Sequence, residues 1–253
     1  MTKYEGHKTT IISNIPIFIT VRGNSDENIK KHQEALKFAY IFIKEQDLFL
    51  QTYIISDNQT DILNFAKDLG FTNLIYYPCG SNKDLKYLEY LATYRYGVEN
   101  NYHPDWIIIL NINQLFRSKN LIAECIRNID DKYDVIASYT EISNRSHFFV
   151  DESLKNHEDK PNEHLLSSEY QRVKMVDASI YAIKSDFAYE CMEYNDPSSH
   201  FWNGKIKYFK NNSVYTDIYT VDDIYKYCRV CEILNKRKEI DDCQHDNCQG
   251  AKV

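Results

Sequence analysis

The loop Arg22-Gly23-Asn24-Ser25 holds the residues of this 253-residue chain whose types and placement most suggest chemistry. It follows an apolar, β-branched run over residues 15–21, which predicts a buried strand. From about Asn28 the apolar residues recur with helical spacing. Because loop N–H groups and a helix N-terminus both favour an anion, this order of elements predicts a phosphate site. A turn without any ligand is an equally good interpretation, since neither GxxxxGK[ST] nor GxGxxG is present.

The elements that would position this loop alternate between strand and helix from the N-terminus to about residue 140. After the first helix, the apolar patterns predict strands and helices in turn, over residues 48–56, 60–69, 74–77, 84–99, 105–110, 118–129 and 133–139. This alternation predicts an α/β fold of the Rossmann-like, doubly wound type, in which helices cover both faces of a mostly parallel sheet.

Further polar residues follow the predicted strands, where ligands bind in open α/β sheets. Asp57 and Asn58 come after the second strand, and Asn111 follows the apolar strand at 105–110. The carboxyl ends of parallel strands meet at one edge of a sheet. We therefore expect these three side chains to lie close to the loop at 22–25.

A polar segment over residues 143–174 interrupts the alternation and divides the chain. Residues 1–142 are expected to form a nucleotide-binding α/β half, and 143–174 an insertion that acts as a lid or a dimerisation arm. Residues 175–235 would complete the domain. The charged residues 236–253 predict a flexible tail.

Within the third part, the pattern predicts a strand, a helix, a strand-like piece and a final helix, over residues 174–184, 185–194, 214–220 and 221–234.

Composition and charge exclude several classes of function. The net charge of −7 disfavours a broad nucleic-acid surface. No apolar run reaches the roughly 18 to 20 residues of a membrane span, and the first residues lack the apolar core of a secretion signal. We expect a cytoplasmic protein with no nucleic-acid or membrane partner.

The seven cysteines, an odd number, favour free thiols in a reducing compartment. Cys228 and Cys231 form a CxxC pair, and Cys243 and Cys248 follow near the C-terminus. A zinc site built from these four is one interpretation. The other is that Cys228 and Cys231 pack as small apolar residues, because they fall within a helical pattern.

Taken together, residues 14 to 235 resemble the acylneuraminate cytidylyltransferase family, which makes CMP-activated sialic-type sugars, and its relative for the eight-carbon sugar acid of lipopolysaccharide. The family loop reads approximately ARGGSKGxxxKN, or ARxNSKG. Arg22, Asn24, Ser25 and Lys31 match it, whereas Asp26, Glu27 and His32 stand where the family has Lys, Gly and Asn.

Other segments continue the resemblance. The segment IISDNQTDILNFAKDLGF resembles VVSTDxxEIAEIAKxYGA, and DWIIILNINQLFRS resembles DxVVLLQPTSPLRT, with Arg117 matching. YDVIASYTEIS resembles DSVVSVTEVS. The segment beginning at Asp177 resembles NGAIYAI, with Asp177 in place of Asn.

The metal-binding motif of the family, IDIDTxED, aligns with residues 216–223. Asp217 takes the first metal position and Tyr219 replaces the second aspartate. Residues two apart on a strand face the same side, so the family directs both carboxylates to one magnesium ion. One carboxylate with phosphates and water can also hold Mg²⁺. Asp222 and Asp223 are expected to cap the following helix.

The resemblance implies transfer of CMP from CTP to a sugar acid of the sialic type, with release of pyrophosphate, by a homodimer that uses Mg²⁺. It implies that Arg22, Lys31 and Asp217 are catalytic, with Asp217 on the metal. The nucleotide would contact Arg22, Gly23, Asn24, Ser25, Asn111 and Arg117, and the substrate would contact Asp57, Asn58 and Asp177.

Two alternatives remain open. Asp26, Tyr219 and Asp177 each remove a group that the family uses, which favours a degenerate relative that binds a nucleotide or a protein without catalysis. The same fold with a different nucleotide or acceptor is the other alternative.

Overall fold

The computed structural model describes residues 15–78, 96, 103–143, 172–193, 204–213, 216 and 218–229. Their strands are β1 (Ile17–Val21), β2 (Thr52–Ser56), β3 (Asn73–Tyr76), β4 (Trp106–Leu110), β5 (Val135–Ser143), β6 (Arg172–Lys184) and β7 (Ile206–Lys210). Their helices and helical turns are α2 (Asp26–Gln46), η1 (Phe49–Gln51), η2 (Gln59–Leu63), α3 (Asn64–Leu69), α5 (Leu121–Arg127) and α6 (Ser185–Glu193). Residues 221–229 are also helical.

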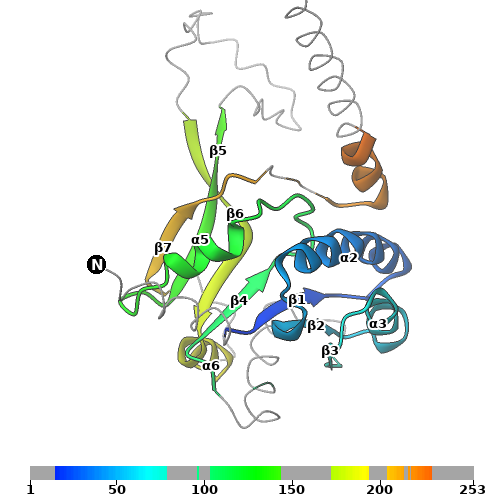
Figure 1. The fold of residues 1–253 in the computed structure, drawn as a ribbon, viewed down its shortest axis with the longest axis horizontal. Helices are drawn as coiled ribbons and strands as arrows, with labels where there is room; N and C mark the ends of the chain where they lie inside the picture. The colour runs from blue at the N-terminus through cyan, green and yellow to red at the C-terminus, as the bar shows by residue number, and fades with distance from the viewer. Residues whose placement is uncertain are drawn as a thin grey trace, which may run out of the picture.

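The strands form one sheet in the order β3-β2-β1-β4-β6-β5-β7 (Figure 1). Neighbouring strands pair in parallel except on both sides of β6, which runs antiparallel to β4 and to β5. The predicted α/β class and the mostly parallel sheet are confirmed. The chain leaves β1 for β2 on one side and returns to β4 on the other, so the carboxyl ends of β1 and β4 flank a topological switch point.

Alternating strand residues divide the interior into two layers, as a pleated sheet requires. On β1, Ile17, Ile19 and Val21 face the layer that contains residues of α2, α3 and α5, whereas Phe18 faces the layer that contains residues of α6. Helices therefore cover both faces of the sheet. The strands β1 and β4 are fully buried, as expected for central parallel strands.

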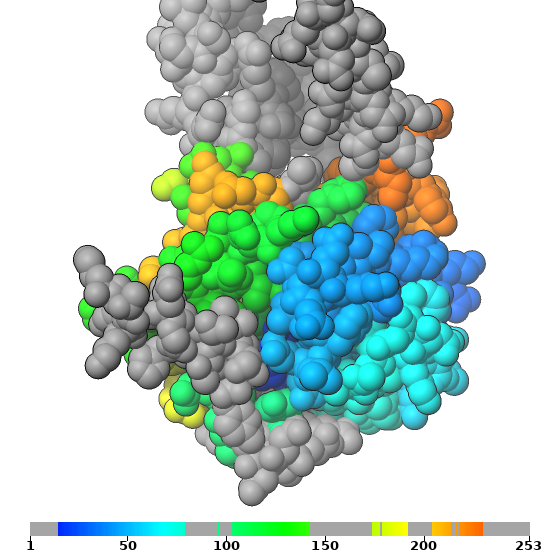
Figure 2. Space-filling view, viewed as in Figure 1, coloured from blue at the N-terminus to red at the C-terminus, as the bar shows by residue number. Residues whose placement is uncertain are grey.

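One face of the molecule is built by α2 in light blue and by α5 with its preceding loop in green (Figure 2). The helical residues 221–229, in orange, adjoin this surface, and the rings of Phe116 and Tyr227 lie 6.4 Å apart. No helix in the described ranges is long and apolar enough to cross a bilayer.

Several element boundaries differ from those that the sequence predicts. The strand predicted at 48–56 begins only at Thr52, because residues 49–51 form a 3₁₀ turn. The strand β7 was not predicted, although it closes one edge of the sheet. In the strand-like piece predicted over 214–220, the described residues 216 and 218–220 are not in a strand.

The polar segment predicted as an insertion over residues 143–174 lies between β5 and β6, but Ser143 belongs to β5 and residues 172–174 belong to β6. These strands form a long antiparallel ladder in which Ser143 pairs with Arg172. The ladder places β6 between β4 and β5, so residues from before and after the segment share one sheet. Residues 144–171, the helix predicted at 84–99 apart from Tyr96, and the tail at 236–253 lie outside the described residues.

Candidate functional site

The loop that follows β1 is held by side chains from two other elements. Asp57 Oδ1 accepts a hydrogen bond from the Gly23 N–H at 2.8 Å, and Asn58 Nδ2 donates to the Gly23 carbonyl at 3.2 Å. On the other side, His32 Nδ1 lies 2.7 Å from the Arg22 carbonyl. The loop is therefore fixed at its first two residues, and Asp57 and Asn58 lie beside it as the sequence predicts.

Gly23 is required by the close approach of the neighbouring turn. A Cβ atom added at this position would lie 2.4 Å from Asn58 Cβ, far inside van der Waals contact. The absence of a side chain at Gly23 thus allows Asn58 to reach the loop carbonyl.

The start of α2 leaves several backbone donors available. Ser25 is the N-cap residue, and its hydroxyl accepts from the Asn28 N–H. The N–H groups of residues 24–27 make no hydrogen bond within the described part of the chain. The exposed side chains of Asp26 and Glu27 occupy the first helical turn, where carboxylates interact favourably with the helix dipole.

Two basic side chains border these donors. Arg22 Nε lies 3.5 Å from Asp57 Oδ2, and Arg22 Nη2 is buried without a hydrogen-bond partner. Lys31 is only 8% exposed and makes no ion pair or hydrogen bond with the described residues. Burial lowers the pKa of Lys31, and the nearby Glu27 carboxylate opposes this shift. Both side chains therefore have bonding capacity left for an anion.

His32 is a buried, neutral residue that connects two loops. Burial lowers its pKa to about 4, and the hydrogen bond with the Arg22 carbonyl opposes this shift. Since the ring is neutral at pH 7 and a carbonyl only accepts, Nδ1 carries the proton and donates to Arg22. The side chain of Asn113, in the loop after β4, interacts with the same imidazole ring. His32 therefore links the loop after β1 with the loop after β4.

The loop after β4 is organised around Arg117. Its Nη2 donates to the Asn111 carbonyl at 2.7 Å, and its guanidinium carbon lies 5.6 Å from the centre of the Phe42 ring. Nε and Nη1 are buried without hydrogen-bond partners. Burial lowers the pKa of Arg117 to about 10, so the side chain stays cationic at neutral pH.

The same loop is bonded to the segment that precedes the predicted metal ligand. Gln114 Oε1 accepts from the N–H and the hydroxyl of Thr216, and the Leu115 N–H donates to that hydroxyl. Thr216 is fully buried. Asp217 itself lies outside the described residues, so its assignment as metal ligand stays a prediction.

Asp223 caps the helix at 221–229, as the sequence predicts. Its Oδ2 accepts from the Thr220 N–H and hydroxyl, and the Asp223 N–H donates back to the same hydroxyl, which forms a capping box. These hydrogen bonds lower the pKa of Asp223 to about 2.

Asp177 is buried in the sheet, and its carboxylate is fully hydrogen-bonded. Ser138 and the Ser179 N–H donate to Oδ1, and Asn211 Nδ2 donates to Oδ2 at 2.9 Å. These contacts join β5, β6 and the residue after β7. The described contacts of Asp177 are therefore structural, and its role in substrate binding stays a prediction.

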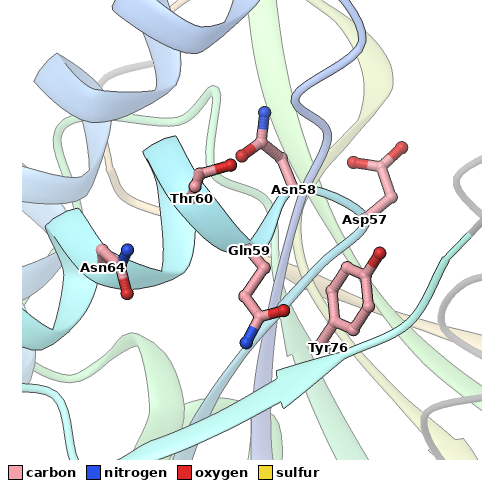
Figure 3. Close-up of a pocket in the computed structure, with 6 residues that line it drawn as sticks. All are labelled: Asp57, Asn58, Gln59, Thr60, Asn64 and Tyr76. Carbon is pink, nitrogen blue, oxygen red and sulfur yellow. The ribbon is translucent and has the colours of Figure 1, made fainter.

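A cleft of about 480 Å³ opens at the carboxyl ends of β2 and β3 (Figure 3). It is lined by Asp57, Asn58, Gln59, Thr60, Asn64 and Tyr76. Asp57 also contacts Arg22 and Gly23, so the cleft adjoins the loop after β1.

No group of three or more His, Cys, Asp or Glu side chains that could hold a metal ion occurs in the described part of the chain. Asp57 and Asp177 are already engaged by an ion pair and by hydrogen bonds, so they do not form a magnesium site by themselves. Cys228 is half-buried and packs against the core, while Cys231, Cys243 and Cys248 lie outside the described residues.

Sequence reasoning missed the roles of His32, Asn113 and Thr216. His32 was noted only as a departure from the family loop, yet a histidine at a core-facing helical position carried a signal, because such a residue needs a buried partner. Asn113 and Thr216 carried no comparable signal, since their contacts join residues about 80 and 100 positions apart.

No family model matches the chain, and no curated protein matches it. Solved structures do. A CMP:2-keto-3-deoxy-manno-octonic acid synthetase complexed with CTP is 14% identical, with a TM-score of 0.57, and the match covers 88% of this chain and 99% of that one. A putative glucose-1-phosphate thymidylyltransferase from Bacillus anthracis is also 14% identical, with a TM-score of 0.55. That match covers 84% of this chain and 93% of that one.

The bifunctional IspDF of Campylobacter jejuni is 16% identical with a TM-score of 0.55, and the match covers 84% of this chain but 53% of that one. The chain thus spans about half the length of this longer protein. At these identities the likeness concerns the fold. The chain has the α/β fold of the nucleotide-diphospho-sugar transferases.

Proposed function

We propose that this protein is a cytidylyltransferase that transfers CMP from CTP to a sugar acid of the sialic type and releases pyrophosphate. One observation carries the proposal. Four N–H groups, of residues 24–27, are unpaired within the described part of the chain at the loop and first turn that lead into the 21-residue helix α2, beside Arg22 and the buried Lys31, which has no partner among the described residues. Donors and cations in this arrangement suit a polyphosphate. The fold, shared with nucleotidyltransferases, supports the same reading.

The chain's own residues would act mainly by position and charge. The N–H groups of residues 24–27 would bind phosphate oxygens, and Arg22 and Lys31 would balance the charge that accumulates on the leaving pyrophosphate. Asn111 and Arg117 belong to the neighbouring loop after β4, on the other side of the switch point. Arg117 has two free buried donors for the nucleotide.

Magnesium is part of this proposal through Asp217 and the nucleotide phosphates. Asp57 and Asp177 are already engaged by an ion pair and by hydrogen bonds, so Asp217 is the carboxylate that would hold the ion. A homodimer in the cytoplasm, with residues 143–174 covering the sugar or reaching a partner, also belongs to the proposal.

The test is release of pyrophosphate by purified protein with CTP, Mg²⁺ and a panel of sialic-type and eight-carbon sugar acids. We expect turnover that needs Mg²⁺ and is abolished by Asp217→Ala. If the purified protein releases no pyrophosphate from CTP with any acceptor of the panel, the proposed transferase activity is wrong.

A non-catalytic, nucleotide-binding relative is the second candidate, and two observations favour it. Asp26 places an exposed carboxylate in the first turn of α2, next to the proposed phosphate. Tyr219, at the second metal position of the resembling family, is 72% exposed. Stabilisation of the fold by CTP without any release of pyrophosphate would support this candidate. Stabilisation by CTP together with release of pyrophosphate would support the enzyme.

A further inference from the structure

Asp177 is a buried carboxylate on β6 on which three hydrogen-bond donors converge. It is 4% exposed and makes no ion pair with the described residues. Ser138 and the Ser179 N–H donate to Oδ1, and Asn211 Nδ2 donates to Oδ2. Because donors point at both oxygens, the position needs two acceptors, which a carboxylate provides and an amide does not.

The first oxygen is connected to the start of the β4 loop, the name used below for residues 111–118. The Ser179 N–H donates to Asp177 Oδ1 at 2.9 Å. The Ser179 carbonyl in turn accepts from the Asn111 N–H at 3.1 Å. Asn111 comes directly after β4, so these two hydrogen bonds, the first arm, fix the first residue of the β4 loop.

The second oxygen is connected to the other end of the β4 loop by three hydrogen bonds, the second arm. Asn211 Nδ2 donates to Asp177 Oδ2 at 2.9 Å, and Asn211 Oδ1 accepts from the Ser213 N–H at 2.8 Å. Ser213 Oγ accepts from the Ser118 N–H at 2.8 Å. Asn211 is 3% exposed, so water does not compete for its amide. The second arm therefore fixes the last residue of the β4 loop.

Between its two ends, the β4 loop holds the segment that leads to the predicted metal ligand. Gln114 Oε1 and the Leu115 N–H are both hydrogen-bonded to Thr216. The segment over residues 211–216 is thus attached at its start to Asp177 and at its end to the β4 loop. Its next residue is Asp217. One buried carboxylate therefore anchors two segments that carry or precede residues of the proposed site.

We propose that Asp177 is a positioning residue for the proposed transfer reaction. Its two oxygens fix both ends of the β4 loop, and through Asn211 they fix the segment before Asp217. This role differs from the substrate contact that the resemblance implies, because Asp177 acts through other residues. Its effect on catalysis rests on the proposed cytidylyltransferase function, whereas the hydrogen bonds of the two arms do not depend on it.

An exchange of the carboxylate with the neighbouring amide tests the second arm. Asp177→Asn keeps an oxygen for the first arm but turns an NH₂ group toward the amide of Asn211. Asn211 cannot compensate by turning its amide, because its NH₂ group would then meet the Ser213 N–H. In the double variant Asp177→Asn, Asn211→Asp, the amide at position 177 donates to the carboxylate at position 211. That carboxylate also accepts from Ser213, so the second arm is restored.

Hydrogen exchange of backbone amides, measured by NMR on the full chain, reports the two arms separately. In Asp177→Asn we expect the protection of the Ser118 N–H to fall about tenfold or more, while that of the Asn111 N–H stays unchanged. The double variant should restore the protection of Ser118. Ile183→Val, a buried change on the same strand, is the control, because it lowers the stability of the fold without altering either arm. It should leave the ratio of the two protection factors unchanged.

Ser213→Ala provides a second test that does not require Asp177→Asn to fold. Ser213 is half-buried, and its hydroxyl accepts from the Ser118 N–H in the second arm. This variant should also lower the protection of Ser118 and spare that of Asn111. Unchanged protection of Ser118 in either variant, or a folded double variant that does not restore it, would overturn the assignment.

Steady-state kinetics distinguishes positioning from a direct contact with the substrate. Positioning predicts that Asp177→Asn lowers kcat about tenfold with little change in KM for the acceptor, and that the double variant recovers kcat. A direct contact predicts a higher KM and no recovery in the double variant, because the carboxylate has moved. That result, or a kcat that Asp177→Asn leaves unchanged, would overturn the positioning role.

The two measurements also separate this inference from the function on which it rests. If the wild type releases no pyrophosphate but hydrogen exchange responds as expected, the proposed function fails and the two arms stand. If the wild type is active but the protection of Ser118 does not respond to Asp177→Asn, the function stands and the role of Asp177 is wrong.

Discussion

Arg22 and Asp57 join the carboxyl ends of β1 and β2 by an ion pair, in which Arg22 Nε lies 3.5 Å from Asp57 Oδ2. The side chains are 17% and 9% exposed, so the pair is largely shielded from solvent. The other carboxylate oxygen accepts the Gly23 N–H. Asp57 therefore orients the guanidinium and fixes the loop that carries it, which makes it a positioning residue in the proposed function.

Asp57→Asn should separate these two effects, because an amide oxygen can still accept from Gly23 while the ion pair is lost. We expect kcat to fall about tenfold and the free energy of unfolding to fall by about 1 kcal/mol. Asp57→Ala removes both contacts and should cost about 2 to 3 kcal/mol. Glu34→Gln, which breaks an exposed ion pair with Lys37, is the control. If Asp57→Asn and Asp57→Ala lowered the free energy of unfolding equally, the hydrogen bond to Gly23 and the ion pair with Arg22 would not be separate contributions.

Gly23→Ala should release the loop from the turn after β2, because the added methyl group would clash with Asn58 Cβ. We expect a loss of about 1 to 3 kcal/mol in unfolding free energy and weaker CTP binding. The double variant Gly23→Ala, Asn58→Gly removes the clash and should recover part of the binding. Denaturant titration and calorimetric titration with CTP measure the two effects. If the double variant lost as much stability and CTP affinity as Gly23→Ala and Asn58→Gly lose together, a clash between these two side chains would not be the cause.

Arg117→Met should affect both folding and binding. The variant loses the hydrogen bond to the Asn111 carbonyl and the contact with Phe42, so we expect the free energy of unfolding to fall by about 1 to 3 kcal/mol. The CTP-induced rise in Tm should also shrink strongly if the unpaired Nε and Nη1 donors contact the nucleotide. Differential scanning fluorimetry with and without CTP reports both quantities. A variant with an unchanged CTP shift would restrict Arg117 to tying the Asn111 loop to α2.

The stability of the protein should depend on His32 between pH 4 and 6.5. Its pKa is about 4 in the folded chain and 6.5 unperturbed, so the unfolded state binds the proton more readily in this window. The contribution of His32 is complete above pH 6.5 and is lost as the pH falls to 4, by up to about 3 kcal/mol. Urea unfolding at several pH values measures it, with His32→Asn as reference. Parallel pH profiles for the two proteins would refute the assignment.

Local patterns in the sequence predicted the elements that carry the site. The β-branched run before Arg22 and the helical spacing after Asn28 correspond to β1 and α2, because strand and helix periodicity are properties of neighbouring residues. The positions of Asp57 and Asn58 beside the loop also followed, since parallel strands end at a common edge. The edge strand β7 escaped prediction because only Phe209 of its five residues is buried, which leaves only a weak apolar pattern.

Sequence alone therefore determined an α/β chain with a polar loop at the end of its first strand and candidate cations nearby. Only the tertiary structure decided that β6 enters antiparallel between β4 and β5, that His32 lies beneath the loop, and that Arg117 is buried with donors to spare. These features depend on contacts between residues far apart in the chain. Packing, register and burial select such contacts, and no local pattern of residue types encodes them.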